Sequence, residues 1–425
     1  MSREVAKNMT KMTKVDCLSE VKQQFPIFTK QAQLGNPFHY LDNAASAHKP
    51  QSVIDAITNS YSEFYAPISR GVYPLAETAS EQYEAARQTI AQFIGTNSQQ
   101  LAFTKSATES LNMVAEYAIK PILQAGDEVW VSEAEHHSNY LPWQRICASS
   151  KASLRILKLD DSGKLILPSL SDIQNAKVKC IALSLISNVL GHYADAADLA
   201  DLFTRAKSLG IFTVVDATQA ISIHSVDVET ISCDFLAFSG HKMFGPTGIG
   251  VLYIAQCAGH LIEPMLVGGG MVEWVGEHYR ENVWSPGVNA LEAGSPNFTG
   301  AIGLAAATEF IQSLDAIKVR QHIAQLAVNC GHAIKQEPGF IVFGDECNWR
   351  SGIVAFAHDS VHPHDIAQIC AQHGVAIRAG HHCAQPLMNA LGHVATARAS
   401  FSVYNDAHDL EALISSLRAA QALFS

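Results

Sequence analysis

The sequence of 425 residues contains no apolar run that approaches the roughly 20 residues needed to cross a bilayer. Basic residues are also scarce, with 29 Lys and Arg against 40 Asp and Glu and a formal net charge of −11. An acidic chain without a long Lys/Arg run is poorly suited to bind a phosphate backbone. We therefore expect neither a membrane nor a nucleic acid as a partner.

The nine cysteines form none of the usual patterns, because they are scattered, odd in number and without a C-x-x-C pair. This argues against a disulfide framework and against a zinc ribbon, so no metal site is expected. Residues 1–14 lack the apolar stretch of a secretory signal and predict a flexible tail. A reducing cytoplasm fits this cysteine usage best.

Short apolar runs alternate with helical patterns through the first two thirds of the chain. Helices are predicted at 50–65 and 78–94, after a helical start at 16–25 that Pro26 should close. The apolar runs lie at 101–103, 128–131, 180–185, 211–215, 235–238 and 250–254. This alternation predicts an α/β fold with a largely parallel sheet that is covered on both faces.

The pattern changes near Gly268. Residues 271–297 are rich in Gly, Pro, Trp and Asn and predict a loop or hairpin excursion. A long helical stretch at 300–336 is broken once near Leu314. Strands at 340–343, 352–357, 375–378 and 396–401, with helices at 363–373 and 407–423, then predict a smaller α+β unit.

A lysine motif, Ser239-Gly240-His241-Lys242, follows the apolar run 235–238. Burying an ammonium is costly, and a desolvated lysine has a lowered pKa that suits it to covalent catalysis. Ser239 and His241 could donate hydrogen bonds to a phosphate. A solvated lysine on a glycine-rich turn is about equally consistent with these residues.

Asp216 and Gln219 stand at the end of the run 211–215, and ligands of open α/β sheets bind at the carboxyl ends of strands. An acid there can keep a pyridinium nitrogen protonated. An aspartate that caps a helix is the commoner case.

Two further motifs also follow apolar runs. In Glu135-His136-His137 an imidazole can stack on a flat aromatic cofactor, although a surface histidine pair or half of a metal site would look the same. In Ser106-Ala107-Thr108-Glu109 the start of a helix can bind phosphate, and the same residues fit an ordinary capping box.

The last motif is Arg378-Ala379-Gly380-His381-His382-Cys383. A cysteine beside Arg and His favours the thiolate, which makes Cys383 a candidate nucleophile. An inert buried cysteine and a His/Cys metal cluster are the alternatives. Arg398 lies in an apolar strand and needs an anionic partner, either a substrate carboxylate or an internal salt bridge.

Together these motifs, from about residue 16 to 424, resemble the class V, fold-type I pyridoxal-phosphate enzymes. Within that class the chain looks like the Suf/Csd-type (group II) cysteine desulfurases, which overlap with selenocysteine lyases. The short loop that carries Cys383, and the sequence of that loop, favour the Csd branch of this group. The matching blocks, in order, are Leu41-Asp42-Asn43-Ala44-Ala45, Glu135-His136-His137, Ser187-Asn188-Val189-Leu190-Gly191, Asp216-Ala217-Thr218-Gln219, Ser239-Gly240-His241-Lys242, Glu292-Ala293-Gly294-Ser295-Pro296-Asn297 and Arg378 to Pro386.

The resemblance implies a large cofactor domain at 31–298 with a mostly parallel seven-stranded sheet, and a small α+β domain at 299–425 that carries the cysteine loop. A segment at 15–30 should pack with the small domain. The resemblance implies that the cofactor is pyridoxal 5'-phosphate and that the following residues hold it. Lys242 carries it, Asp216 pairs with its ring nitrogen, Gln219 contacts its phenolic oxygen, His136 stacks on its ring, Thr108, Ser239 and His241 bind its phosphate, and Ser295 reaches the phosphate of the other subunit of a homodimer.

The resemblance also implies how the substrate is held. Asn188 and Arg398 hold the substrate carboxylate, Arg378 lies near the path of the thiol, and Cys383 receives the sulfur as a persulfide. Three positions depart from the family pattern: Ser69 replaces a His, Ala107 replaces a hydroxyl residue and Ser295 replaces a Thr. Because Ser295 keeps the hydroxyl, phosphate binding is expected to survive.

The implied function is the conversion of L-cysteine to L-alanine, with the sulfur passed to a small SufE/CsdE-type acceptor protein for iron–sulfur cluster or other sulfur-compound biosynthesis. A selenocysteine lyase acting on L-selenocysteine would use the same fold, and the sequence does not separate the two. Transamination or kynurenine cleavage has no use for a thiol at Cys383. A non-catalytic scaffold that binds a sulfur carrier is disfavoured, because each cofactor position holds a competent residue.

Overall fold

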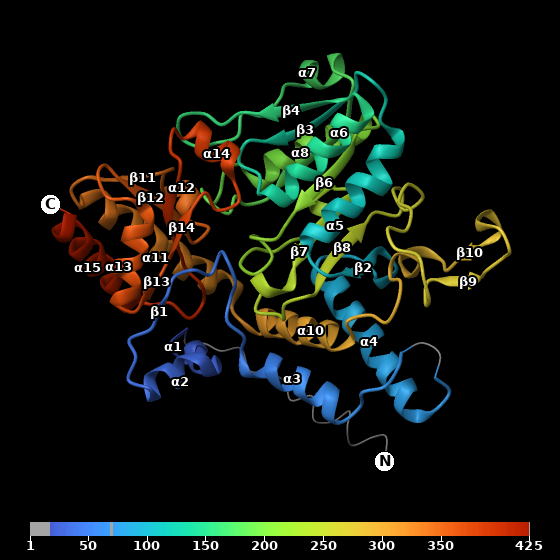
Figure 1. Cartoon of the computed structure of the whole chain (residues 1–425), viewed down its shortest axis with the longest axis horizontal. Helices are drawn as coiled ribbons and strands as arrows, with labels where there is room; N and C mark the ends of the chain where they lie inside the picture. Colours follow the sequence, from blue (N-terminus) through green and yellow to red (C-terminus); the bar gives the residue numbers. More distant parts are fainter. Residues whose placement is uncertain (1–17, 69–70, 425) are drawn as a thin grey trace.

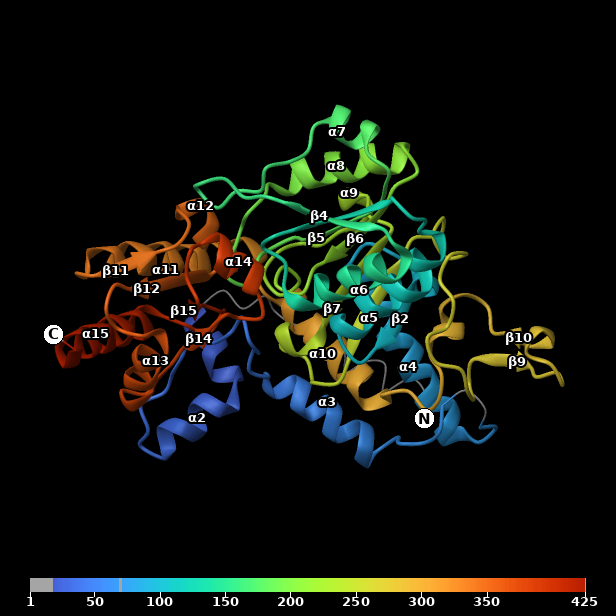
Figure 2. The same cartoon turned by 45° about the horizontal axis from the view of Figure 1, so that its top comes forward.

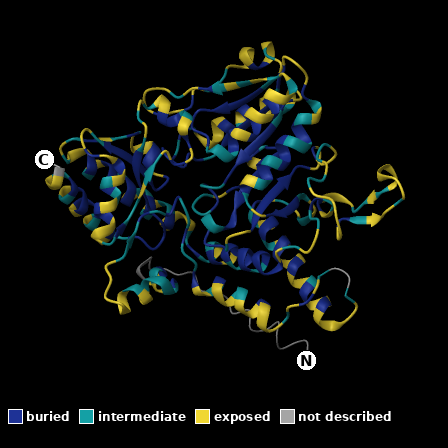
Figure 3. Cartoon of the chain, in the orientation of Figure 1, coloured by how far each residue is buried: buried dark blue, intermediate teal, exposed yellow. Residues whose placement is uncertain are grey.

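The structure is a computed structural model that describes residues 18–68 and 71–424. The tail expected at 1–14 and the departure at Ser69 lie outside the described residues. Figure 1 shows a large unit built on one sheet and a smaller C-terminal unit beside it, and Figure 2 shows α8 on one face of the sheet with α5 and α6 on the other. Buried residues follow the strands of both units (Figure 3).

The large sheet has seven strands in the order β2-β8-β7-β6-β5-β3-β4, which confirms the expected α/β fold. All neighbours are parallel except at β8, which runs antiparallel to both β2 and β7. Strands β7 and β8 are buried along their whole length, as near-continuous apolar strands require. The strands are β2 (Leu101–Thr104), β3 (Glu128–Ser132), β4 (Ser153–Leu157), β5 (Val178–Ser184), β6 (Phe212–Asp216), β7 (Phe235–Ser239) and β8 (Gly250–Ile254).

The helices of this unit begin where the sequence provides caps or proline. Pro74 opens α4 four residues before the predicted start, and Ser106 caps α5. The helices are α3 (Gln51–Ser62), α4 (Pro74–Phe93), α5 (Ala107–Val114), α6 (Leu141–Ser150), α7 (Leu170–Asn175), α8 (Ala196–Ser208) and α9 (Val228–Ile231).

The C-terminal unit holds a four-stranded antiparallel sheet in the order β11-β12-β15-β14. The predicted break falls at Leu314, which is extended, and Asp315 then caps the next helix. The strands are β11 (Phe340–Val342), β12 (Ile353–His358), β14 (Arg378–Gly380) and β15 (Thr396–Ser400); the helices are α10 (Phe298–Ser313), α11 (Ala316–Gln336), α12 (Glu346–Trp349), α13 (Pro363–Gln372), α14 (Gln385–Ala390) and α15 (Ala407–Phe424). Helix α10 packs against α3 and α4 of the large unit, and the domain boundary at 299 stays a prediction.

The helical stretch expected before Pro26 is α1 (Leu18–Val21) followed by a 3-10 turn (Lys22–Gln24), and it ends at the extended Phe25, as predicted. Sequence reasoning missed that Pro26 also opens a second helix, α2 (Pro26–Gln33). Proline suits this place because its missing N–H would have no helical partner there. Phe25 packs edge-on against Phe310 and Tyr404, and β1 (His39–Tyr40) pairs with β13 (Val375–Ala376), so this segment contacts the C-terminal unit.

The excursion predicted at 271–297 is a two-stranded antiparallel ribbon, β9 (Val272–Trp274) and β10 (Val283–Trp284). It projects from the large unit, and most of its residues are exposed (Figures 1 and 3). Within the described residues, the helices are all too short or too polar to span a bilayer.

Candidate active site

A cavity of about 260 Å³ opens at the carboxyl ends of β5, β6 and β7. Each residue that sequence reasoning assigned to the site lines this cavity, except Ser295. Ser295 lines a separate cavity with Tyr61, Tyr65 and Gly269 of the same chain. One cavity therefore joins predicted site residues that lie up to 290 positions apart in the sequence, from Thr108 to Arg398.

Lys242 ends a 3-10 turn (Gly240–Lys242) that follows β7. Part of its side chain faces the cavity, but its ammonium is enclosed by the protein and donates to the Ala44 carbonyl at 2.7 Å. This desolvation, reinforced by the Arg398 guanidinium, lowers the pKa of Lys242 to about 8. A lysine solvated on a turn would keep its ordinary pKa, so the structure favours the chemical role.

Asp216 ends β6 and is buried. Its Oδ1 accepts from the Thr218 N–H at 2.9 Å, and Gln219 Nε2 donates to the Ala44 carbonyl at 2.9 Å. Burial raises the pKa of Asp216, and the hydrogen bond from the Thr218 N–H and the Lys242 charge oppose that rise. A buried carboxyl beside Lys242 suits a cationic ring nitrogen, which would stabilise its ionised form.

The N-terminus of α5 meets the end of β7 at the far end of the cavity. The Ala107 N–H donates to Ser239 Oγ at 2.9 Å, and the hydroxyls of Thr108 and Ser138 lie 2.7 Å apart. Gly250 permits this approach, because a Cβ there would lie 2.6 Å from Ser106 Cα. Backbone N–H groups, hydroxyls and the His241 ring thus surround a space suited to a phosphate.

The predicted capping box at this helix is only half formed. The Glu109 N–H donates to Ser106 Oγ at 3.3 Å, but the Glu109 carboxylate accepts from the Lys105 N–H instead of from that of Ser106. The helix start is therefore capped and still faces the cavity.

His136 is mostly buried, and its Nδ1 accepts from the Ser138 N–H at 3.1 Å, which leaves the proton on Nε2. Burial, reinforced by the Lys242 charge, lowers its pKa to about 4. The preceding residue, Glu135, stabilises this turn, because its buried carboxyl accepts hydrogen bonds from the Ser132 hydroxyl at 2.6 Å and from Asn139 Nδ2 at 2.7 Å. A neutral imidazole held this firmly can lie flat against a cofactor ring.

Cys383 is exposed at the mouth of the cavity, and it and His382 both have left-handed backbone φ values, 54° and 51°. This backbone conformation is strained for residues other than glycine, and residues with such strain are often found in functional loops. The large unit holds the loop: the Cys383 carbonyl accepts from the His137 N–H at 2.7 Å, and His137 stacks on His381.

Arg378 and Arg398 form the remaining wall, and sequence reasoning missed the residue that joins them. Asp42 accepts from Arg378 Nη2 at 2.9 Å and from Arg398 Nη2 at 3.1 Å. Arg398 also donates to the Asn188 carbonyl at 2.8 Å. The two interpretations left open for Arg398 are both accommodated, because it has an internal salt bridge and also faces the cavity.

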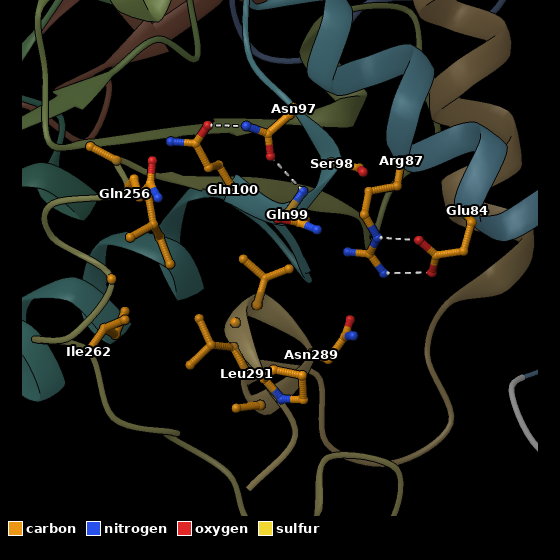
Figure 4. Close-up of a pocket in the computed structure, with 17 residues that line it drawn as sticks. Glu84, Arg87, Asn97, Ser98, Gln99, Gln100, Gln256, Ile262, Asn289 and Leu291 are labelled. Atoms are coloured by element: carbon orange, nitrogen blue, oxygen red, sulfur yellow. Dashed lines mark hydrogen bonds and ion pairs between the residues drawn. The ribbon is translucent and has the colours of Figure 1, made fainter.

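A second cavity, of about 450 Å³, contains none of the predicted residues. It lies at the other edge of the sheet, beside the ends of β2 and β8, and is lined largely by uncharged side chains such as Asn97, Gln100 and Gln256 (Figure 4). Its Arg87 is already paired with Glu84 and Glu292. Among the described residues, the buried polar side-chain atoms that lack a hydrogen-bond partner include four at the 260 Å³ cavity and none at this second one.

Comparison with known proteins agrees with this geometry. The profile of the family "Aminotransferase class-V" matches residues 39–413. The chain belongs to the class-V aminotransferase family. A probable cysteine desulfurase of Vibrio cholerae is 40% identical over 404 residues, covering 95% of this chain and 98% of that protein. One from Halalkalibacterium halodurans is 37% identical over 406 residues, with coverage of 95% and 98%.

Two solved structures that are named cysteine desulfurase are also similar to this chain. The cysteine desulfurase CsdA of Escherichia coli, in its S-sulfonic acid form, has 36% identity and a TM-score of 0.86, covering 97% of this chain and 100% of that one. The apo cysteine desulfurase of Thermococcus onnurineus has 34% identity and a TM-score of 0.87, with coverage of 95% and 98%. These full-length likenesses confirm the fold-type I architecture and the expected Csd-type relationship.

The cavity also passes a physical test for a cofactor and an amino acid. Buried polar atoms without a hydrogen-bond partner are costly, and four of those in the described part of the chain belong to residues of this cavity: Arg398 Nε, Thr218 Oγ1, Asn188 Oδ1 and His382 Nδ1. Bound polar groups would satisfy them. The amine, acid and phosphate-binding groups present fit pyridoxal phosphate.

Proposed function

We propose that this chain is a pyridoxal-phosphate-dependent cysteine desulfurase that converts L-cysteine to L-alanine and leaves the sulfur on Cys383. The observation that carries the proposal is one cavity with Lys242 and Asp216 on one wall and Cys383 on the other. A transaminase needs the first wall but has no use for the second. The relatives named cysteine desulfurase support the same activity.

The cofactor would be held by residues of the large unit. Lys242 attaches it, Asp216 pairs with its ring nitrogen, Gln219 faces its phenolic oxygen, His136 covers the ring, and Thr108, Ser239 and His241 bind the phosphate. When bound, pyridoxal phosphate supplies an electron sink that stabilises negative charge at the substrate Cα. Lys242, whose pKa of about 8 lies near neutral, is the base that removes the Cα proton.

The substrate would be held by the arginine wall. Arg398 Nε is a buried donor without a partner among the described residues, and it suits the α-carboxylate. Asn188 fits less simply, because its Nδ2 already donates to the His382 carbonyl at 2.7 Å and its unpaired atom is the acceptor Oδ1. That acceptor suits the substrate nitrogen, while the carboxylate contact remains a prediction.

Cys383 then takes the sulfur. Its thiolate forms an S–S bond to the substrate sulfur as the Cβ–S bond breaks, and the electron pair of that bond remains on the carbon side. Protonation of that carbon yields alanine, and Cys383 is left as a persulfide, a reversible cysteine state. Exposure of Cys383 allows the persulfide to be passed on.

Assembly and partners follow from the same site. We propose a homodimer in which Ser295 reaches the phosphate of the other subunit, because Ser295 lies outside the cavity of its own chain. The acceptor of the sulfur would be a small SufE/CsdE-type protein that approaches the exposed Cys383. A thiol that must stay reduced between turnovers fits a cytoplasmic setting.

The deciding experiment begins with the visible spectrum of the purified protein. L-Cysteine is then added, alanine is quantified, and the mass of the peptide that contains Cys383 is measured. A yellow protein that releases alanine and gains one sulfur atom at Cys383 is the expected result. Alanine without sulfur at Cys383 would contradict the nucleophile, and a colourless protein that cannot be loaded with the cofactor would contradict the proposal as a whole. L-Selenocysteine in the same assay distinguishes the lyase, which should release alanine even from a Cys383→Ser variant.

A further inference from the structure

Cys383 lies in a tight turn whose backbone conformation is unfavourable for the residues that form it. The Ala384 N–H donates to the His381 carbonyl at 2.8 Å, and the two central residues, His382 and Cys383, both have positive φ. Turns with two positive φ values favour Gly, Asn and Asp, because other side chains crowd the backbone there. Contacts from outside the turn must therefore hold it, and with it the thiol, in place.

Two histidines bind both backbone polar groups of Cys383. The Cys383 N–H donates to His381 Nδ1 at 3.1 Å, and the Cys383 carbonyl accepts from the His137 N–H at 2.7 Å. The His137 ring adds a third contact, because its Nε2 accepts from the Gln385 N–H at 3.2 Å. The residue that carries the thiol is thus held by its own loop on one side and by the large unit on the other.

The contact between His137 and Gln385 also takes the place of a helix cap. Gln385 is the first residue of α14, and Ala384 before it provides no side-chain cap. The first N–H groups of a helix have no partner within the helix and need one from outside. His137 lies 248 positions earlier in the sequence, so its ring fixes the start of α14, and the turn before it, to the large unit.

The two ring nitrogens can hold the turn only as hydrogen-bond acceptors. A backbone N–H always donates, so His137 Nε2 and His381 Nδ1 must each be unprotonated. Burial, reinforced by the nearby His381, lowers the pKa of His137 and favours its neutral form. The rings also stack, with centroids 5.7 Å apart and planes inclined by 28°, an arrangement that two charged imidazoles would oppose.

We propose that His137 and His381 are positioning residues for sulfur transfer: together they hold the Cys383 turn so that its thiol meets the substrate sulfur in the cavity. Neither histidine lines that cavity, whereas Cys383 does, so both act through the cysteine. This inference rests on the proposed function, since it concerns the nucleophile of the same site. A misplacement of about 1 Å can slow a reaction about 100-fold, so loss of this support should slow the transfer.

The test compares two substitutions at each position that differ in where they place an acceptor. The side-chain oxygen of asparagine lies near the place of Nδ1, and that of glutamine lies near the place of Nε2. His381→Asn should therefore keep the rate of persulfide formation within about threefold of wild type, because asparagine also bonds the N–H two residues on, while His381→Gln should slow it about tenfold. At position 137 the order reverses: His137→Gln should keep the rate and His137→Asn should slow it.

The rate is measured in a single turnover of the cofactor-loaded protein with L-cysteine, from the mass of the peptide that contains Cys383. Hydrogen–deuterium exchange at residues 381–390 of the substrate-free protein reports the same hydrogen bonds without chemistry, and it should quicken only in the two slow variants. Binding of L-serine, which carries no sulfur, is followed by visible absorbance and should stay unchanged in all four. His332→Gln is the matched control, since this exposed histidine pairs with Glu346 away from the cavity.

Equal rates, or equal exchange, in the Asn and Gln variants of one position would overturn the inference for that histidine, because the place of the acceptor would then not matter. Slow transfer that is accompanied by weaker L-serine binding would overturn it as well, since the histidine would then support the whole site. Failure of the proposed function looks different: the wild-type protein would form no persulfide at Cys383, while the exchange pattern of the variants would still report the hydrogen bonds.

Discussion

The two walls of the active-site cavity are built in different ways. On the cofactor wall, Lys242 and Asp216 directly follow buried strands of the large sheet, so the sheet itself fixes their positions. On the sulfur wall, Cys383 is exposed on a strained loop that is held by contacts from distant segments, such as the His137 N–H. A cofactor must stay in one place during turnover, whereas a sulfur carrier must face both the cavity and an external acceptor.

The largest expected effect comes from the variant Lys242→Ala, which removes the reactive group of the cofactor wall. Loss of the amine removes both covalent attachment of the cofactor and the base at Cα, so alanine formation should fall by about 10⁴-fold and the visible absorbance should disappear. Lys158→Ala is the control, since this exposed lysine pairs with Glu133 away from the cavity. Alanine production at a normal rate from Lys242→Ala would remove the distinction between the walls.

Cys383→Ser should leave the cofactor wall intact. The visible spectrum and the equilibrium binding of L-serine should match those of the wild-type protein, while persulfide formation and sulfur transfer from L-cysteine are lost. The measurements are absorbance titration and mass spectrometry of the peptide. Cys257→Ser, at another exposed cysteine, is the matched control and should change neither. Loss of the cofactor spectrum in Cys383→Ser would show that the walls are coupled.

Gly250→Ala probes the packing that supports the phosphate end of the cofactor wall. The new Cβ would meet the backbone of Ser106 at 2.6 Å, so the start of α5 must shift away from β8. We expect a loss of about 1–3 kcal/mol in unfolding free energy and weaker cofactor binding, measured by denaturant unfolding and by titration of the apoprotein. Gly259→Ala is the control, because the nearest atom to its new Cβ would be at an ordinary 3.7 Å. Equal behaviour of the two variants would contradict the close-approach argument.

The smallest expected effect concerns pH. Burial lowers the pKa of His136 to about 4 and that of His382 to about 3, one histidine on each wall, from the ordinary 6.5. Since the unfolded chain binds more protons in this range, stability that is present above pH 6.5 is lost as the pH falls toward 4 and below. The urea midpoint should therefore drop through this window.

A third buried histidine, outside the cavity, should contribute to the same pH dependence. His224 has a pKa lowered to about 3 by burial and by its neighbour His192, and it does not line the cavity. His224→Gln should flatten part of the pH dependence of the urea midpoint and leave alanine formation at neutral pH unchanged. A midpoint that falls as steeply as in the wild-type protein would exclude His224 as a contributor.

Sequence reasoning located the cavity residues that follow a strand, and their roles stay predictions. Lys242, Asp216 and His136 each stand just after an apolar run, so the general location of ligands in α/β sheets was sufficient. It failed at β4, because Ser153–Leu157 is a partly exposed edge strand whose apolar residues alternate with polar ones and form no continuous run. It also missed that Pro26 opens a helix in addition to ending the one before it, because proline is compatible with both places.

Long-range pairs were out of reach for a different reason. Asp42 meets Arg378 and Arg398, its partners at sequence separations of 336 and 356. The packing of the C-terminal sheet against the Leu41–Ala45 segment determines that meeting, and local sequence patterns contain no information on it. The role of Ser295 stays a prediction, because it concerns a second subunit.

The antiparallel strand β8 has a consequence for how the chain is made. Within the described residues, strand β2 pairs with β8 alone, and β8 is synthesised about 150 residues later. Until the ribosome has added residues 250–254, β2 has no neighbour and the start of α5 has no support from Gly250. The phosphate end of the site is thus completed only after residue 250 has been added, and β2, a short apolar segment, is left unpaired and open to aggregation until then.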